Sequence, residues 1–151
     1  MKKRLTLAPL TIILGCSLIW PLAMLADSAQ WEKQVRVKLA ALAVLMGIAD
    51  ATMSHDPYIG SLRNNTYTDL TLTLHKGVNY ALVGVCDTDC DDLDIKLYND
   101  DGQLVGQDTK PDNTPIVGVV PAHTQEFTLR MVMSRCNNNP CFYGVGVYSH
   151  E

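Results

Sequence analysis

From residue 58 onward, apolar and polar side chains alternate with a period of two. Leu70, Leu72 and Leu74, for example, alternate with Thr71 and Thr73. Strand-like segments cover residues 70–75, 80–85, 93–98, 103–107, 116–120, 127–133 and 142–148, and among them 80–85 is almost wholly apolar. Short strands at about ten-residue spacing, separated by turn residues, predict a mainly β fold: an antiparallel, jelly-roll-like β-sandwich with about seven to eight strands.

A different pattern precedes the strands. Between residue 31 and about residue 53, apolar side chains recur every three or four residues, at Trp31, Val35, Leu39, Leu42 and Met46. This spacing predicts one amphipathic α-helix. Asp27 and Ser28 offer an N-terminal cap, and Pro57 disfavours a helical residue before it. We expect the helix to pack on the sandwich. The alternative is a subunit whose helix docks on a partner through Val35, Leu39, Leu42 and Met46.

The N-terminal residues have the layout of an export signal. Lys2, Lys3 and Arg4 precede an uncharged run over residues 5–26, and a polar stretch follows. This order predicts a signal peptide over residues 1–26, with cleavage after Ala26 or, as a second choice, Ala29. The predicted division is then signal peptide 1–26, helical segment 27–57 and β-sandwich 58–151. Retention of the run as a membrane anchor, or acylation of Cys16, are the alternatives.

Net charge narrows the choice of partner. Removal of residues 1–26 takes away three positive charges and no negative ones, so the formal charge changes from −4 to −7. Binding to phosphates depends on Lys and Arg, so nucleic acid is excluded as a partner, and anionic lipid is disfavoured. Stable membrane insertion after cleavage is not expected. The predicted location is the periplasm or the medium. As partners, cations or basic surfaces match the acidic chain better than phosphates do.

Four cysteines remain in the predicted mature chain, namely Cys86, Cys90, Cys136 and Cys141. An even number of closely spaced cysteines in an exported protein predicts disulfides. Turn-forming residues separate the members of each close pair, which favours the pairings 86–90 and 136–141, although crossed pairings are compatible with the sequence. A four-thiolate zinc site has suitable spacing too, but it requires a reducing compartment.

An acidic stretch follows Cys86. Its candidate cation ligands are Asp87, Asp89, Asp91, Asp92 and Asp94. The helix-loop-helix calcium motif is excluded, because Asp92 occupies the position of its glycine and Tyr98 that of its final glutamate. In a strand, Asp92 and Asp94 project to one face, so a calcium site at the edge of the sandwich is one interpretation. A solvated loop with local turn hydrogen bonds is the other.

The motifs that carry a family resemblance are residues 80–85, Cys-Asp-x-Asp-Cys-x-Asp-Leu-Asp-Ile-x-Leu-Tyr from Cys86, an Asp-Gly turn, Asp108, Pro115 and Phe142-Tyr143-Gly144-Val145. Over about residues 62–149 they resemble the bacterial pre-peptidase C-terminal (PPC) domain family. The resemblance implies a noncatalytic β-sandwich module of a secreted protein, and some members bind calcium or extracellular polymers. Asp92 and Asp94 match the family's acidic strand. The cysteine pairs, the N-terminal helix and the lack of a catalytic domain depart from the family.

The chain has no convincing catalytic motif. Ser54, His55 and Asp56 are the residue types of a catalytic triad, but immediate neighbours cannot adopt its geometry in that order. We therefore predict no enzyme and no catalytic residue. The predicted function is an exported binding or structural module, stabilised by calcium if the acidic stretch binds it, with an envelope protein or an extracellular polymer as partner. A hydrolase using carboxylates of the acidic stretch is the least favoured alternative.

Overall fold

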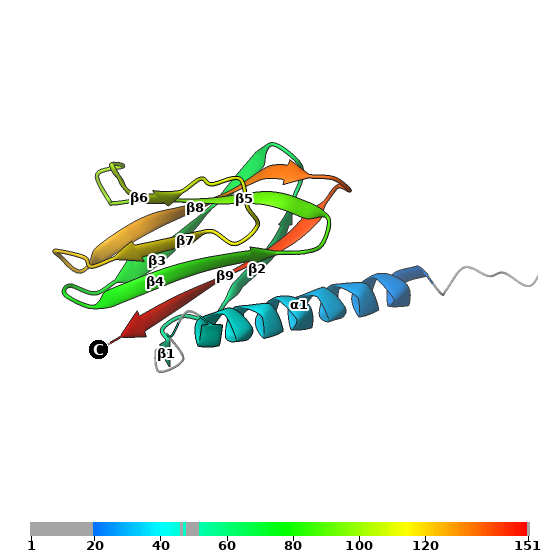
Figure 1. Ribbon diagram of the computed structural model, residues 1–151, viewed down its shortest axis with the longest axis horizontal. Coiled ribbons are helices and arrows are strands. Elements are labelled where there is room, and N and C mark those ends of the chain that lie inside the picture. Colours follow the sequence, from blue (N-terminus) through cyan, green and yellow to red (C-terminus); the bar gives the residue numbers. More distant parts are fainter. Residues whose placement is uncertain (1–19, 46, 48–51, 151) are drawn as a thin grey trace, which may run out of the picture.

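The computed structural model describes residues 20–45, 47 and 52–150 (Figure 1). One helix is followed by nine strands. They are α1 (Trp20–Leu45), β1 (Thr52–Met53), β2 (Tyr58–Leu62), β3 (Thr66–Leu74), β4 (Asn79–Cys86), β5 (Cys90–Tyr98), β6 (Leu104–Asp108), β7 (Ile116–Val119), β8 (Gln125–Cys136) and β9 (Cys141–His150).

The strands form two antiparallel sheets packed face to face. Sheet A has the order β1-β9-β4-β7, and β2 pairs with the same strand, β9, as β1 does. Sheet B has the order β3-β8-β5-β6. The predicted sandwich is therefore confirmed. The strands β1 and β2 were not predicted, because both are short and neither shows a clear two-residue alternation.

The main core fills the space between the sheets. Sheet B contributes the apolar members of its alternating strands, such as Leu72, Leu93, Ile95, Leu129 and Met131. Their polar neighbours point to the other side, as expected for strands with one buried face. The alternation in the sequence therefore results from the burial of one face of each of these strands in the core.

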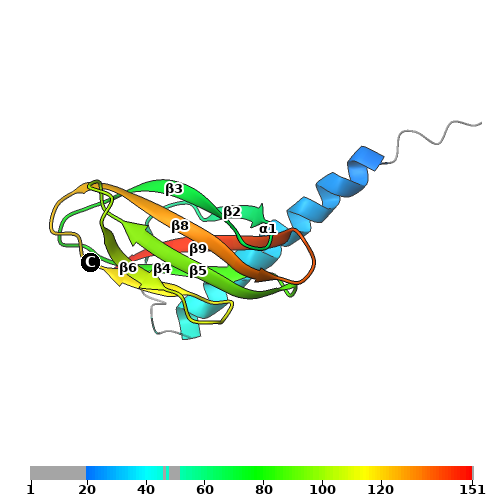
Figure 2. The same ribbon diagram turned by 90° about the horizontal axis from the view of Figure 1, so that it is seen from above.

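The central strands β4 and β9 of sheet A are buried on both faces, because α1 lies along the outer side of this sheet (Figures 1 and 2). Val35, Leu39 and Ala43 of the helix form a second apolar cluster with Val83 and Val85 of β4, and Tyr148 of β9 joins it. This arrangement explains why residues 80–85 are almost wholly apolar instead of alternating. A strand covered on both faces has no solvent side on which to place polar residues.

The helix docks at defined points on sheet A. A Cβ atom at Gly144 would overlap the side chain of Val35, so the glycine allows the helix to lie directly against β9. The Tyr148 hydroxyl donates a hydrogen bond of 3.1 Å to the carbonyl of Leu39. The ring of Trp31 stacks on that of Phe142, with centroids 5.1 Å apart.

The helix differs from the expected segment at both ends. It begins at Trp20, upstream of the predicted cleavage point, and ends at Leu45, well before Pro57. Thr52 and Met53, expected near the helix end, pair instead with β9 as strand β1. Within the described residues, no helix is both long and apolar enough to cross a membrane. Residues 1–19 of the predicted signal peptide, which include Cys16, lie outside the described part of the chain.

The predicted alternative docking mode is not the arrangement observed. Val35 and Leu39 are buried against the protein's own sheet, and Leu42 packs at the edge of the same cluster. Met46 lies outside the described residues. These side chains are therefore occupied within the chain.

Candidate binding surfaces

Both predicted disulfides are present, and both lie at one end of the sandwich. Cys86 pairs with Cys90, and Cys136 pairs with Cys141, with Cα atoms 6.0 Å and 5.8 Å apart. Each closes a turn that passes from one sheet to the other. Cys90 and Cys136 are register partners in sheet B, which brings the two bridges side by side. The local pairing predicted from the turn residues is thus confirmed.

Asp87 has a structural position in this end of the molecule. Its carboxylate is buried and accepts hydrogen bonds from the backbone N–H of Phe142, at 2.7 Å, and of Asp89, at 3.1 Å. The Asp87 N–H donates in return to the carbonyl of Phe142. Asp87 therefore ties the first disulfide turn to the start of β9.

The other candidate ligands point in different directions. Asp91 accepts a hydrogen bond from Asn137 Nδ2 at 2.8 Å. Asp94 accepts one from the hydroxyl of Ser134 at 2.5 Å. The backbone carbonyl of Asp89 accepts from the N–H of Asn137. Over the described residues, no three His, Cys, Asp or Glu side chains are placed to hold one metal ion. The five aspartates therefore do not converge on a common point.

Asp92 lies in an unfavourable environment. Its Oδ1 atom is buried and has no hydrogen-bond partner, while Oδ2 lies 3.9 Å from Arg135 Nη2. Burial, followed by repulsion from Asp94, raises the pKa of Asp92, and the attraction of Arg135 does not offset them. As predicted, Asp92 and Asp94 lie opposite the core residues Leu93 and Ile95.

Asp108, which is not one of the predicted cation ligands, is a buried structural carboxylate. It accepts hydrogen bonds from the N–H of Ile116, at 3.0 Å, and of Lys110, at 3.4 Å. Burial alone would raise the pKa of Asp108, but these bonds and the nearby Lys110 ammonium lower it overall. Asp108 thereby joins the end of β6 to the start of β7. In the sequence, Asp108 stands out only as one of the residues that carry the resemblance to the PPC family.

In the described part of the chain, no helix covers the outer face of sheet B, in contrast to sheet A (Figure 2). Register places the outward side chains of adjacent strands in rows across the sheet. One row runs from Asp69 through Arg130 to Lys96. The side chains of Tyr67 and Tyr98 come from the rows on either side. We call Tyr67, Asp69, Lys96, Tyr98 and Arg130 the open-face cluster.

Arg130 organises the open-face cluster. Its Nε and Nη2 atoms donate to the two oxygens of Asp69 at 2.7 Å and 2.8 Å. The guanidinium carbon lies 4.1 Å from the centroid of the Tyr67 ring and 5.5 Å from that of Tyr98. Hydrogen bonding to Arg130 lowers the pKa of Asp69, and the same pairing raises that of Arg130. The planar guanidinium of Arg130 makes two hydrogen bonds and lies between two rings, and these contacts hold it in one orientation.

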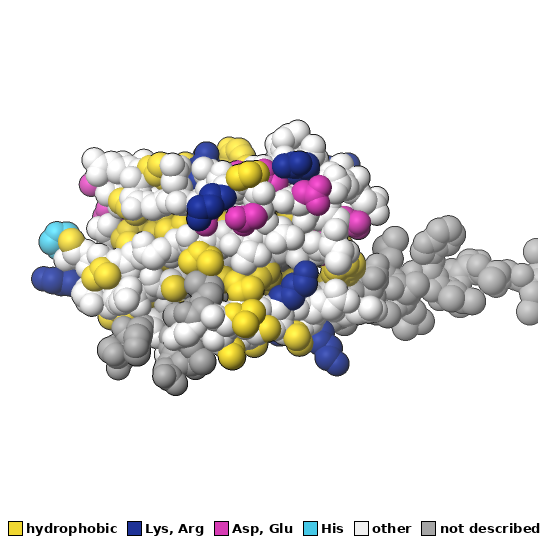
Figure 3. Space-filling view, viewed as in Figure 1, with side chains coloured by type: hydrophobic (Ala, Val, Ile, Leu, Met, Phe, Trp, Pro, Cys, Tyr) yellow, Lys and Arg dark blue, Asp and Glu magenta, His cyan; other side chains and the backbone are white. Residues whose placement is uncertain are grey.

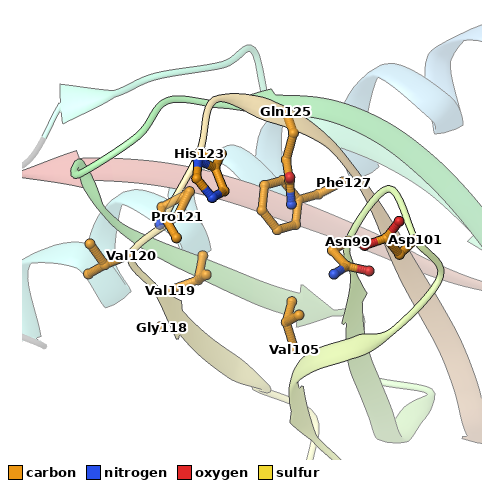
Figure 4. A pocket seen from close by; sticks show the side chains of 11 residues that line it. Asn99, Asp101, Val105, Gly118, Val119, Val120, Pro121, His123, Gln125 and Phe127 are labelled. Carbon is orange, nitrogen blue, oxygen red and sulfur yellow. The ribbon is translucent and has the colours of Figure 1, made fainter.

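A cleft of about 490 Å³ opens at the end of the sandwich opposite the disulfides (Figure 4). Val105, Val119 and Phe127 provide apolar lining, and Asp101 and His123 come from two neighbouring loops. Lys and Arg are not among its lining residues in the described part of the chain. The cleft is thus chemically distinct from the open-face cluster.

The structure leaves Ser54, His55 and Asp56 without triad geometry. The Ser54 hydroxyl lies 2.9 Å from His55 Nδ1, but it also donates to the carbonyl of Val147 at 3.1 Å. In the described chain, no hydrogen bond links His55 to a carboxylate that could orient its ring. The contact is an exposed local one at the start of the sandwich.

No family model matches the chain, and no curated protein matches it either. One solved structure to which this chain is similar is that of PliG from Aeromonas hydrophila, a periplasmic inhibitor of g-type lysozyme. It is 12% identical, with a TM-score of 0.46, and the match covers 63% of this chain and 85% of that one. At this level the likeness supports no conclusion about activity or partner. The resemblance to the PPC family stays a prediction.

Proposed function

We propose that this protein is an exported, noncatalytic binding module that recognises a protein partner through the outer face of sheet B. The observation that carries the proposal is the open-face cluster, in which Arg130 is held by Asp69 and stacked between Tyr67 and Tyr98. Tyr67 is 57% exposed, so the cluster is accessible. A rigid, exposed arrangement of this kind loses little conformational freedom on binding.

The composition of the face favours a protein over a polymer of uniform charge. Tyr and Arg are the residues that most often dominate the binding energy of protein interfaces. Lys96 and Arg130 lie close to Asp69 and Asp94 on the same face, so both signs of charge are interspersed. Such a mixture selects a partner of complementary pattern and gives little attraction to a uniformly charged chain.

Export is part of the proposal. Two disulfides in one small domain are typical of an oxidising compartment, and the basic start with its uncharged run is typical of a signal sequence. A noncatalytic module of a secreted protein is also what the PPC resemblance implies. These features support a periplasmic or secreted location.

The calcium proposal narrows to Asp92 and Asp94. Asp87 and Asp91 are engaged elsewhere by backbone and side-chain donors. Burial and repulsion from Asp94 raise the pKa of Asp92, so a cation near this pair would relieve an existing repulsion. This is a proposal about stability, and it concerns residues that lie on the same face as the open-face cluster but do not belong to it.

The binding proposal is tested by capture followed by reconstitution. The exported protein is immobilised, envelope proteins that bind it are identified, and the affinity of each purified candidate is measured by calorimetry. We expect Tyr67→Ala and Arg130→Gln each to weaken binding of the true partner by about 1–4 kcal/mol, or roughly fivefold to a thousandfold. Val120→Ala, at an exposed position outside the face, serves as the control. A partner whose affinity neither face variant changes would refute this surface as the binding site.

A further inference from the structure

Strands β6 and β7 are the last strands of sheets B and A, and they lie on the same side of the sandwich. In the described part of the chain, no strand pairs with the free edge of either. They touch at Gly106, where an added Cβ atom would lie 2.7 Å from Cγ1 of Val117. Beyond this contact, toward the turn between β5 and β6, the cleft of about 490 Å³ opens between them (Figure 4).

The free edge of β7 has backbone groups to offer to another strand. The Gly84 N–H donates to the carbonyl of Pro115 at 2.8 Å, and these two residues are opposite each other in the register of β4 and β7. Hydrogen-bonded positions alternate along an antiparallel pair, so the N–H and C=O groups of Ile116 and Gly118 point to the free edge. The Ile116 N–H is bonded to Asp108. The groups of Gly118 point outward beside the cleft.

The cleft next to Gly118 combines an apolar lining with an acidic rim. The register of β5 and β6 shifts here, which leaves Val105 as the extra residue of a β-bulge. Bulges often redirect a side chain, and Val105 lines the cleft together with Val119 and Phe127. Asp101 is exposed at the rim. Figure 3 looks onto this side of the sandwich and shows hydrophobic side chains between β6 and β7, with acidic ones at the end where the turn between β5 and β6 lies.

These features define the chemistry of an occupant. In a strand added beside β7, the residue opposite Val119 points to the same side as Val119, which is the side of the cleft. A side chain that matches both the apolar lining and Asp101 has an apolar stem and a cationic end, as Lys and Arg do. The charge of the sandwich agrees, because residues 52–150 include twelve acidic and six basic residues.

We propose that the free edge of β7 accepts an extended segment of another protein as an added β-strand, and that a Lys or Arg side chain of this segment occupies the cleft. Main-chain hydrogen bonds to Gly118 supply affinity in this arrangement, and the cleft selects the side chain. The site is additional to the proposed function and does not depend on it, because the cleft and the open-face cluster share no residue.

Calorimetry with defined peptides tests the selection of the side chain. The probes are acetyl-Thr-Val-Thr-X-Thr-Val-Thr-amide, in which X is Lys, Arg, norleucine or Glu, added to the oxidised exported protein. We expect dissociation constants on the order of 0.1 mM for Lys and Arg, and binding at least about tenfold weaker for Glu. Norleucine, which keeps the stem without the charge, should lie between them. Equal binding of the Lys and Glu peptides, or no binding of any peptide at about 1 mM, would overturn the proposal.

Substitution of Gly118 tests the strand addition. Gly118→Pro removes the outward N–H but no bond to β4, so it should weaken the Lys peptide at least about tenfold. Gly118→Ala keeps the N–H, and its Cβ has ordinary contacts, so it is the matched control and should bind normally. Amide hydrogen exchange of the unmodified protein gives a readout that needs no variant. A Gly118 amide whose exchange is not slowed by saturating Lys peptide would overturn the added strand.

Substitution of Asp101 tests the cleft. Asp101→Asn should weaken the Lys peptide about threefold to tenfold and leave the norleucine peptide unchanged. Asp100→Asn, which removes the same charge from an exposed neighbour outside the lining, should have little effect. Equal effects of the two variants would overturn the cleft as the site of the basic side chain. If N-acetyl-lysine methylamide binds as tightly as the Lys peptide, the cleft binds small amines without the edge of β7, and strand addition is wrong.

Discussion

Two carboxylates of sheet B, Asp108 and Asp92, show how neighbouring groups decide the effect of a buried charge. Asp108 receives two backbone N–H bonds and a lysine, and the pKa of Asp108 is lowered below its ordinary value of 3.8. It therefore contributes stability above this pH, which is lost as the pH falls through the lowered pKa. Asp92 has an unpartnered oxygen and a raised pKa. It binds its proton more tightly in the folded state, so its charge destabilises the fold at neutral pH.

The prediction for Asp92 is a stabilising substitution. We expect Asp92→Asn to raise the free energy of unfolding by about 1 kcal/mol at neutral pH, because it removes a poorly solvated charge. The gain should shrink as the pH falls through the raised pKa of Asp92 and should disappear below 3.8, where Asp92 is protonated in both states. Urea denaturation at neutral and acidic pH measures it. Asp91→Asn, which changes the same charge at an exposed neighbour, should have little effect. A loss of stability in Asp92→Asn would show that the Arg135 pair dominates.

At the scale of elements, α1 is positioned by strands β4 and β9 together. The helix contacts β9 at Gly144, at Tyr148 and at Phe142. A side chain at Gly144 has no space, because Val35 already occupies it. Helix and sheet are therefore fitted to each other at this glycine, and the stack of Trp31 on Phe142 reports whether the helix is seated.

We expect Gly144→Val to displace α1 at a cost of about 1–3 kcal/mol, the usual range for overpacking. Displacement exposes Trp31 and should shift its fluorescence to longer wavelength. The measurement uses a Trp20→Phe background, since Trp20 and Trp31 are the two tryptophans of the chain. Gly118→Ala in β7 is the control, because its added Cβ would lie 4.0 Å from the carbonyl oxygen of Tyr80, which is an ordinary contact distance. An unchanged spectrum in Gly144→Val would contradict the docking described above.

At the scale of the whole molecule, the two sheets differ in how far their outer faces are exposed to solvent. Sheet A is enclosed by the core and by α1, and sheet B presents its outer face to solvent (Figure 1). The disulfides join the sheets at one end, and the cleft opens at the other. The binding proposal and any cation near Asp92 therefore both concern the outer face of sheet B, on the side of the domain away from α1.

The calcium proposal predicts a change in the melting temperature of the oxidised protein. A ligand at a hundred times its dissociation constant adds about 2.7 kcal/mol, which raises the melting temperature of a domain of this size by several degrees. We expect the rise in millimolar calcium but not in magnesium, and its loss in Asp92→Asn and Asp94→Asn. If the melting curves in calcium and in chelator coincide, the aspartates act only as local hydrogen-bond acceptors.

The sequence by itself determined the β-sandwich, the presence of a helix and the pairing of the cysteines. These follow from local rules: a period of two for half-buried strands, a period near 3.6 for the helix, and turn residues between each cysteine pair. The same rules placed Asp92 and Asp94 opposite Leu93 and Ile95. These rules did not predict strand β2 or the end of α1. The reason is that β1 and β2 are stabilised by β9, a partner distant in sequence.

Only the tertiary structure decided which surfaces are available. Tyr67, Tyr98 and Arg130 are far apart in the chain, and the register of three strands brings them together. The apolar face of α1 that the sequence highlighted is used internally, and the exposed one is its opposite. The directions of Asp87 and Asp91 depend on Phe142 and Asn137, about fifty residues away. Such contacts depend on long-range packing, which local periodicity does not encode.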